Sequence, residues 1–247
     1  MNRNLKYTNP VLNPNQSFPF TSKTLRDTKN SQSMPEYDNS INLASLSAAY
    51  SDVAGMASTA QQVINIYVKT QLLAQYGNRP MGFMNHTSWV PQHLPLISQQ
   101  RTAWDENQFV PFIPVSTEDS PVWVDLVINN LDDGAHPFHL HGHSFYILSS
   151  FRSEGRSGWG SYNPFAVDGS GPPAGLDLVH PLRKDTVSVP RRGHVVIRFK
   201  AGNQGLWMLH CHMLVHLGSG MAMGLHVGPT GDEENVIGME KTATALC

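Results

Sequence analysis

The feature that most limits the fold of this chain is a series of short apolar segments with a two-residue period. Alternation of this kind is typical of strands that bury one face, and turn residues close most of the segments. Six segments follow the pattern: 63–68, 122–128, 145–148, 187–189, 195–199 and 224–227. Little of the chain has helical periodicity. The pattern therefore predicts an all-β domain with antiparallel strands in a sandwich or a barrel.

The ends of the chain differ from this middle part. Residues 1–40 are rich in Asn, Pro, Ser and Thr and lack apolar periodicity, which is typical of a connecting arm. Apolar residues recur at helical spacing over 42–58 and predict a short helix. We therefore divide the chain into an arm at 1–60, a β domain at 61–230 and a C-terminal tail at 231–247.

Composition excludes several classes of function. The chain has 247 residues, of which 17 are Lys or Arg, 19 are Asp or Glu, and 15% in total are charged. This balance excludes a basic nucleic-acid arm and a polyacidic tail. No run approaches the roughly 20 apolar residues of a membrane span, and the first residues lack the apolar segment of a signal peptide. Twelve histidines with only two cysteines are the unusual feature.

The histidines gather in two short segments. The first, at 136–143, reads HPFHLHGH, and the second, at 210–221, reads HCHMLVHLGSGM. Imidazole and thiolate are ligands that copper favours, and two His with one Cys and a distant Met form a blue-copper site. Zinc is the alternative, but zinc prefers four closed ligands. The excess of histidine and the following methionine favour copper.

Alternation separates these ligands into two groups. In an extended segment, alternate side chains share a face, so the histidines on either side of Cys211 face away from it. The first segment alternates in the same way, so His136 is expected to point to the opposite face from the next two histidines. The predicted first site has three ligands and an axial methionine: His136, Cys211, His216 and Met221. The predicted second centre has two H-x-H pairs: His139, His141, His210 and His212.

The other histidines have simpler interpretations. His143 has the parity of the second centre, and we expect it to form a hydrogen bond near the ligands rather than to bind metal. Five more are expected on the surface or in loops: His86, His93, His180, His194 and His226.

HPFHLHGHSF and HCHMLVHLGSGM resemble the two C-terminal copper signatures of the multicopper oxidases, the family of laccases, ascorbate oxidases and ferroxidases. The resemblance covers roughly 60–230 and corresponds to the third cupredoxin domain of three-domain enzymes. It implies a Greek-key cupredoxin-like β-sandwich or barrel with an N-terminal connecting arm.

The resemblance also assigns the ligands. It implies type 1 copper at His136, Cys211 and His216, and type 2 copper at His139. The type 3 pair would be bound by His141, His210 and His212. Met221 stands where laccases commonly have Leu or Phe, which implies an ordinary rather than a high reduction potential.

The two H-x-H pairs are half of what the family's trinuclear cluster requires. The resemblance therefore implies a second polypeptide that supplies the N-terminal cupredoxin domain and two further H-x-H pairs. In several fungal laccases a cysteine of the C-terminal tail is disulfide-bonded to the first domain, so Cys247 is expected to link the two chains, a free thiol being the alternative. The resemblance also implies a secreted protein.

The resulting hypothesis is a laccase-like oxidase subunit. A phenol or similar small aromatic reductant would give up single electrons beside His216 or His136, and Cys211 would carry them to the shared cluster, where dioxygen is reduced to water. The Gly-rich loop 152–181 and the aromatic-rich segment 86–112 could shape the substrate pocket, with structural packing as the alternative for the aromatic residues.

Two other functions remain open at this point. In a ferroxidase, Asp132 and Asp133 would bind a cation near His136, although a solvated turn explains them equally well; ascorbate-oxidase-like activity is a related alternative. In a non-enzymatic blue-copper electron carrier, the H-x-H pairs would have no use.

Overall fold

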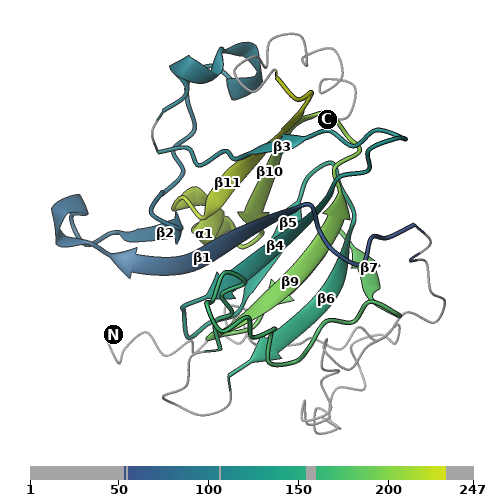
Figure 1. The fold of residues 1–247 in the computed structure, drawn as a ribbon. Coiled ribbons are helices and arrows are strands. Elements are labelled where there is room, and N and C mark those ends of the chain that lie inside the picture. Colours follow the sequence, from purple (N-terminus) through teal and green to yellow (C-terminus); the bar gives the residue numbers. More distant parts are fainter. Residues whose placement is uncertain (1–52, 54, 106, 154–159, 232–247) are drawn as a thin grey trace, which may run out of the picture. The chain divides into compact units, whose positions relative to one another are not determined.

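The structure, a computed structural model, describes residues 53, 55–105, 107–153 and 160–231. Within that part of the chain, eleven strands form two sheets (Figure 1). They are β1 (Gln62–Leu72), β2 (Pro80–Met84), β3 (Phe112–Pro114), β4 (Trp123–Asn130), β5 (His136–Leu140), β6 (Phe145–Arg152), β7 (Leu182–Lys184), β8 (Thr186–Val189), β9 (Gly193–Lys200), β10 (Gly205–Cys211) and β11 (Ala222–Gly228). One sheet has the order β2-β1-β4-β9-β6-β7, and the other has the order β3-β11-β10-β5-β8.

The main core lies between the two sheets. Val124, Leu126 and Ile128 of β4 are fully buried in it, together with Phe138 of β5 and Leu209 of β10. These residues alternate along their strands, because every second side chain of a strand points to the same face. The structure thus confirms the predicted all-β sandwich, and each of the six apolar segments forms a strand.

Two pairs of neighbouring strands differ from the expectation of an antiparallel fold. β1 pairs with β4 in parallel, and β11 pairs with β3 in parallel, whereas the other pairs are antiparallel. The antiparallel prediction is therefore wrong for these two pairs. Alternation of residues sets which face is buried but does not set the direction of a neighbouring strand.

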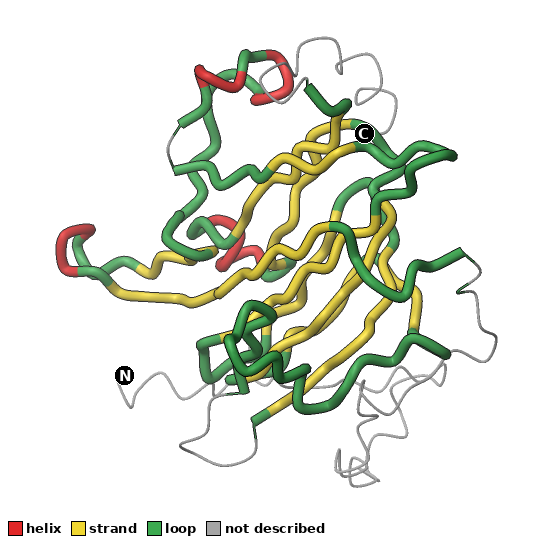
Figure 2. Tube along the Cα trace, viewed as in Figure 1, coloured by secondary structure: helices red, strands yellow, loops and turns green. Residues whose placement is uncertain are grey.

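Helices are few and short in the described residues (Figure 2). They are α1 (Leu214–Gly218) and the 3₁₀ turns η6 (Ala74–Tyr76), η7 (Leu96–Ser98) and η8 (Arg101–Ala103). None of the helices in this part of the chain has the length and apolar character to span a membrane. The predicted helix at 42–58 lies outside the described residues except at 53 and 55–58, which are not helical. Most of the predicted arm also lies outside the described residues. So does the predicted tail apart from residue 231, and Cys247 is among the residues outside.

The described part of the long loop 152–181 packs on the sheet that carries none of the clustered histidines. Tyr162 and Leu178 cover a small second core on the outer face of β4, β6 and β9. The Asn129 side chain fixes Tyr162 by accepting a hydrogen bond from its backbone N–H, at 2.7 Å, and donating to its carbonyl, at 3.0 Å. The described part of this loop thus packs on the sheet that lacks the clustered histidines, and its suggested role in a substrate pocket stays a prediction.

Candidate copper centres

The pairing of β5 with β10 brings the two histidine segments together. The strands are antiparallel, with His210 opposite His139 and Cys211 opposite Phe138. Cys211 and Phe138 are fully buried on the inner face, so the histidines of the pairs lie on the other face. The alternation predicted from the sequence is thus present, and it separates the ligands into two groups.

The first group, which we call the His–Cys cluster, consists of His136, Cys211 and His216. The Cys211 Sγ atom is 3.7 Å from His136 Nδ1 and 3.5 Å from His216 Nδ1, and the two nitrogen atoms are 3.0 Å apart. Cys211 ends β10, and the short helix α1 begins soon afterwards and returns His216 to the sulfur. The structure therefore brings together the three residues that the sequence predicted for one site.

A partly buried carboxylate orients His136. Asp132 Oδ2 is 3.0 Å from His136 Nε2, and it also accepts hydrogen bonds from the N–H and the hydroxyl of Thr70, at 2.7 and 2.8 Å. Burial tends to raise the pKa of Asp132, but the bonds from His136 and Thr70 outweigh it and lower the pKa. The ionised carboxylate fixes the proton on Nε2 and leaves the Nδ1 lone pair for the cluster.

Met221 is joined to the His–Cys cluster through its backbone. Its N–H donates to His216 O at 2.9 Å, and its carbonyl accepts from Cys211 N–H at 3.1 Å. The Met221 side chain is fully buried. These bonds hold residue 221 beside two of the three cluster residues, as an axial ligand requires, while the ligation itself stays a prediction.

The second group, the histidine cluster, contains both H-x-H pairs: His139, His141, His210 and His212. The ring of His139 lies 5.0 to 5.9 Å from the other three rings, centre to centre. His141 Nε2 and His210 Nε2 are 3.0 Å apart. All four imidazoles therefore converge, and His141 and His212 are exposed to solvent.

Backbone carbonyl groups select the tautomers of two of these rings. His139 Nδ1 is 3.0 Å from Asp185 O, and His210 Nδ1 is 3.1 Å from Cys211 O. A carbonyl oxygen can only accept, so each Nδ1 carries the proton and each Nε2 keeps a lone pair. This arrangement is the one that commonly orients metal-binding histidines.

The chemistry of both clusters fits a metal ion. Burial lowers the pKa of His141, His210 and His216, and charge repulsion from neighbouring imidazoles lowers it further, so their lone pairs stay free for metal. Burial raises the pKa of the Cys211 thiol, so a thiolate there needs a cation close by. The Sγ and nitrogen separations suit an ion about 2 Å from each nitrogen and about 2.3 Å from sulfur, distances usual for such ligands.

Three of the other histidines are buried. His143 lies against Phe199, and its Nδ1 is 3.4 Å from His141 O, a contact of the kind expected for it. His194 and His226 are fully buried in β9 and β11, so the expectation of surface or loop positions is wrong for both. The valines beside each of them are the signal for a strand that the expectation overlooked. His86, His93 and His180 are exposed as expected.

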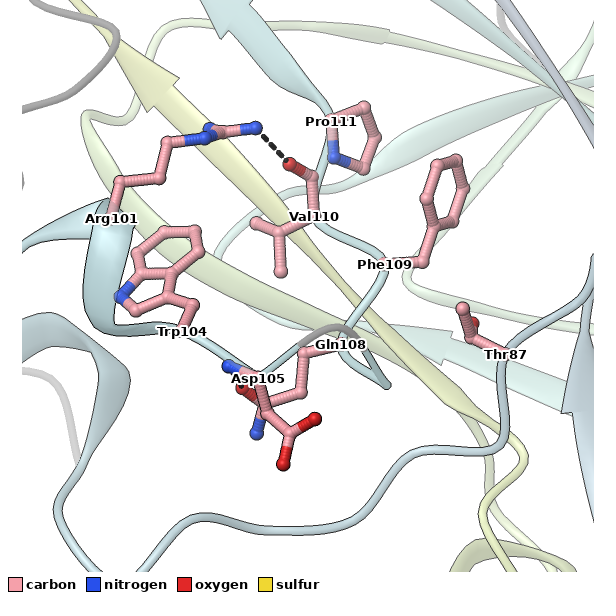
Figure 3. A pocket seen from close by; sticks show the side chains of 8 residues that line it. All are labelled: Thr87, Arg101, Trp104, Asp105, Gln108, Phe109, Val110 and Pro111. Atoms are coloured by element: carbon pink, nitrogen blue, oxygen red, sulfur yellow. Dashed lines mark hydrogen bonds between the residues drawn. The ribbon is translucent and has the colours of Figure 1, made fainter.

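Part of the aromatic segment 86–112 lines a cavity of about 360 Å³ (Figure 3). Trp104 and Phe109 contribute to its walls, but Trp89 and Phe112 do not. Its Arg101 side chain donates to Val110 O at 2.9 Å (Figure 3). None of the residues of the two clusters lines this cavity.

Comparison with known proteins agrees with this geometry. Iron transport multicopper oxidase FET3 of Gibberella zeae is 40% identical over 114 residues, which are 46% of this chain and 17% of that protein. Laccase-2 of Oryza sativa subsp. japonica is 42% identical over 118 residues, which are 46% of this chain and 19% of that protein. The match thus spans less than a fifth of either relative.

The fold and a family model point the same way. The crystal structure of Fet3p, a multicopper oxidase that functions in iron import, has a TM-score of 0.65 and 23% identity. That match covers 95% of this chain and 42% of the other, and it shows the cupredoxin-like fold. The family model described as multicopper oxidase matches residues 85–231. This chain therefore belongs to the multicopper oxidase family.

Proposed function

We propose that this chain is the copper-binding subunit of a laccase-like oxidase, which oxidises small phenolic or aromatic substrates with dioxygen as the acceptor. The observation that carries the proposal is the position of Cys211. Its side chain belongs to the His–Cys cluster, whereas the residues directly before and after it, His210 and His212, belong to the histidine cluster. One strand end thus connects the two groups covalently, an arrangement for which a simple electron carrier has no use.

The chain's own residues divide the work of such an oxidase. Copper bound at the two clusters supplies one-electron redox chemistry and the reduction of dioxygen to water. Asp132 holds the His136 ring, and the carbonyls of Asp185 and Cys211 hold the rings of His139 and His210. The buried position of Cys211 excludes water from its sulfur.

The surface beside His216 favours an organic reductant. Met213, Leu214 and Val215 are 43%, 81% and 72% exposed, and they directly precede His216. An exposed apolar surface of this kind is suited to an aromatic ring rather than to a hydrated metal ion. We place the substrate against these residues, next to the imidazole edge of His216.

The histidine cluster needs further ligands. We propose that a second polypeptide supplies an N-terminal cupredoxin domain with two H-x-H pairs, and that Cys247 links the chains by a disulfide. The exposure of His141 and His212 supports this proposal, because ligands from another chain can reach them. Secretion, which the resemblance to laccases implies, belongs to the same proposal.

A ferroxidase is the second candidate, because a relative that is 40% identical over 114 residues is an iron transport multicopper oxidase. The acids that the sequence offered for iron do not favour it. Asp132 is occupied by His136 and Thr70, and the exposed Asp133 carboxylate is paired with Arg192. Both carboxylates therefore already have partners within the chain, which gives less support to this second candidate.

Oxygen uptake separates the candidates. The copper-loaded chain with its partner is given a diphenol or Fe(II) at equal concentrations, and the steady-state rates are compared. We expect the higher kcat/KM with the diphenol. A higher value with Fe(II) would favour the ferroxidase, and copper binding without oxygen uptake on either reductant would refute the oxidase. Mass analysis of native material with and without reductant tests the partner and the Cys247 disulfide.

A further inference from the structure

Strand β2 and the segment after it hold the turn that carries Met221. The strand contacts α1 and β11 (Figure 1). The N–H of Gly82 donates to Ser219 O at 2.8 Å, and the N–H of Trp89 donates to Gly220 O at 2.9 Å. The hydroxyl of Ser88 donates to Ser219 O at 3.2 Å. Three donors from 82–89 thus fix the backbone just before Met221.

Position 82 has no room for a side chain. A Cβ atom built on Gly82 would lie 2.7 Å from Met221 Cβ and 2.8 Å from Met221 N. Carbon atoms in favourable contact are about 3.5 to 4.0 Å apart, so residue 221 would have to move. Gly82 is not among the glycines with a positive φ, so close approach and not backbone conformation requires glycine here.

Displacement of Met221 would reach the His–Cys cluster directly. The Met221 backbone is hydrogen-bonded to His216 on one side and to Cys211 on the other. Its side chain is fully buried, so it has no free space in which to readjust. The thioether of Met221 is also the predicted axial donor, and the axial donor tunes the reduction potential of a blue-copper site.

We propose that Gly82, supported by Ser88, is a positioning residue for Met221. The close approach of β2 sets where the thioether lies relative to the other three donors, and it thereby sets the reduction potential. The inference rests on the proposed copper site at the His–Cys cluster, and it is independent of the proposed partner and substrate.

The test measures the reduction potential, the visible spectrum and the electron paramagnetic resonance of the copper-loaded full chain. Met221→Leu gives the full effect of losing the thioether. We expect Gly82→Ala to shift the potential in the same direction by a smaller amount. Gly202→Ala is the matched control, because a Cβ there meets no atom within 4 Å and Gly202 also lacks a positive φ. It should leave the potential and both spectra unchanged.

A double variant distinguishes positioning of the thioether from a general effect on the fold. In the Met221→Leu background, Gly82→Ala should cause a smaller shift, because no thioether remains to be displaced and only the movement of the backbone bonded to His216 and Cys211 is left. An equal shift in both backgrounds would overturn the proposal, and so would a Gly82→Ala protein with the wild-type potential and spectra.

A third variant covers the case in which Gly82→Ala does not fold. Ser88→Ala removes only the hydroxyl bond to Ser219, and it should cause a small shift in the same direction. A wild-type potential in Ser88→Ala would then overturn the proposal. Failure of the copper assignment itself looks different: the wild-type chain would lack the blue chromophore altogether.

Discussion

The two clusters share one pair of strands, yet they differ in how complete they are. The His–Cys cluster has its three donors within 3.7 Å of one another, in a largely buried site whose His136 is oriented by a carboxylate. The histidine cluster opens to solvent at His141 and His212. This difference is consistent with our proposal that the chain preorganises one site by itself and that the other receives further ligands from a partner.

Loss of the Cys211 thiolate should stop the function of both the His–Cys cluster and the histidine cluster. Cys211→Ser should abolish the blue absorbance and all oxygen uptake, because the thiolate is the donor that the buried site is built around. Absorption and oxygen-electrode measurements check this expectation. Cys247→Ser is the matched control and should keep the blue colour. Blue colour and turnover that survive in Cys211→Ser would refute the assignment of the His–Cys cluster.

Loss of one histidine from the histidine cluster should affect that cluster and not the His–Cys cluster. His141→Ala should abolish oxygen uptake in the complete enzyme while the blue absorbance remains. The reason is that His141 belongs to the histidine cluster, of which Cys211 is not a member. His180→Ala, which removes an exposed histidine in a loop, should keep both properties. Simultaneous loss of the blue colour in His141→Ala would show that the two clusters are not separate.

Removal of the carboxylate behind His136 should weaken the complete site without abolishing it. Asp132→Asn should lower copper affinity at the His–Cys cluster roughly 10- to 100-fold, the usual cost of losing a partner that orients a ligand. Copper titration followed by visible absorption measures the change. Asp133→Asn changes the neighbouring exposed acid, which does not bond to His136, and should leave the affinity as it is. Equal affinities for Asp132→Asn and the wild type would contradict the proposed orienting role.

Acidification should destabilise the metal-free chain through the clustered histidines. The pKa values of His141, His210 and His216 are lowered from 6.5 in the folded state, chiefly by burial. The unfolded state therefore takes up protons first, and the stabilisation present above about pH 6.5 is lost as the pH falls towards the folded pKa values. Denaturant unfolding between pH 8 and pH 5, at intervals of about one unit, measures this loss. A stability that does not decrease below about pH 6.5 would contradict the pKa shifts.

The smallest expected effect concerns the surface beside His216. Leu214→Ser should raise the KM for a phenol by about two- to fivefold, because less apolar area is available to bury against the ring. The blue spectrum should not change. Leu72→Ser removes another exposed apolar side chain, at the end of β1, and serves as the control. An unchanged KM in Leu214→Ser would place the substrate elsewhere.

Local sequence patterns predicted six of the eleven strands in the described residues, together with the grouping of the ligands. Alternation is a local property, so H-x-H and H-C-H reveal which side chains share a face before the pairing partner is known. The antiparallel register of β5 and β10 then places His210 opposite His139, as the two-centre interpretation required.

Contacts between distant segments could not be predicted. Asp132 suggested a cation site from the sequence, and only the approach of Thr70 on β1 reveals that it is a partly buried partner of His136. β2 was missed because Pro80 and Gly82 interrupt its apolar pattern, and the need for glycine at 82 depends on Met221 far along the chain. Strand direction likewise depends on crossovers that residue alternation does not encode.

The proposal that most needs a test is that this chain holds one complete copper site and half of the ligands of another. The most direct test is copper titration of the isolated chain, followed by visible absorption, electron paramagnetic resonance and oxygen uptake. We expect one tightly bound blue copper per chain and no reduction of dioxygen until ligands for the histidine cluster are supplied. An isolated chain that binds no blue copper, or one that alone reduces dioxygen to water, would contradict the account.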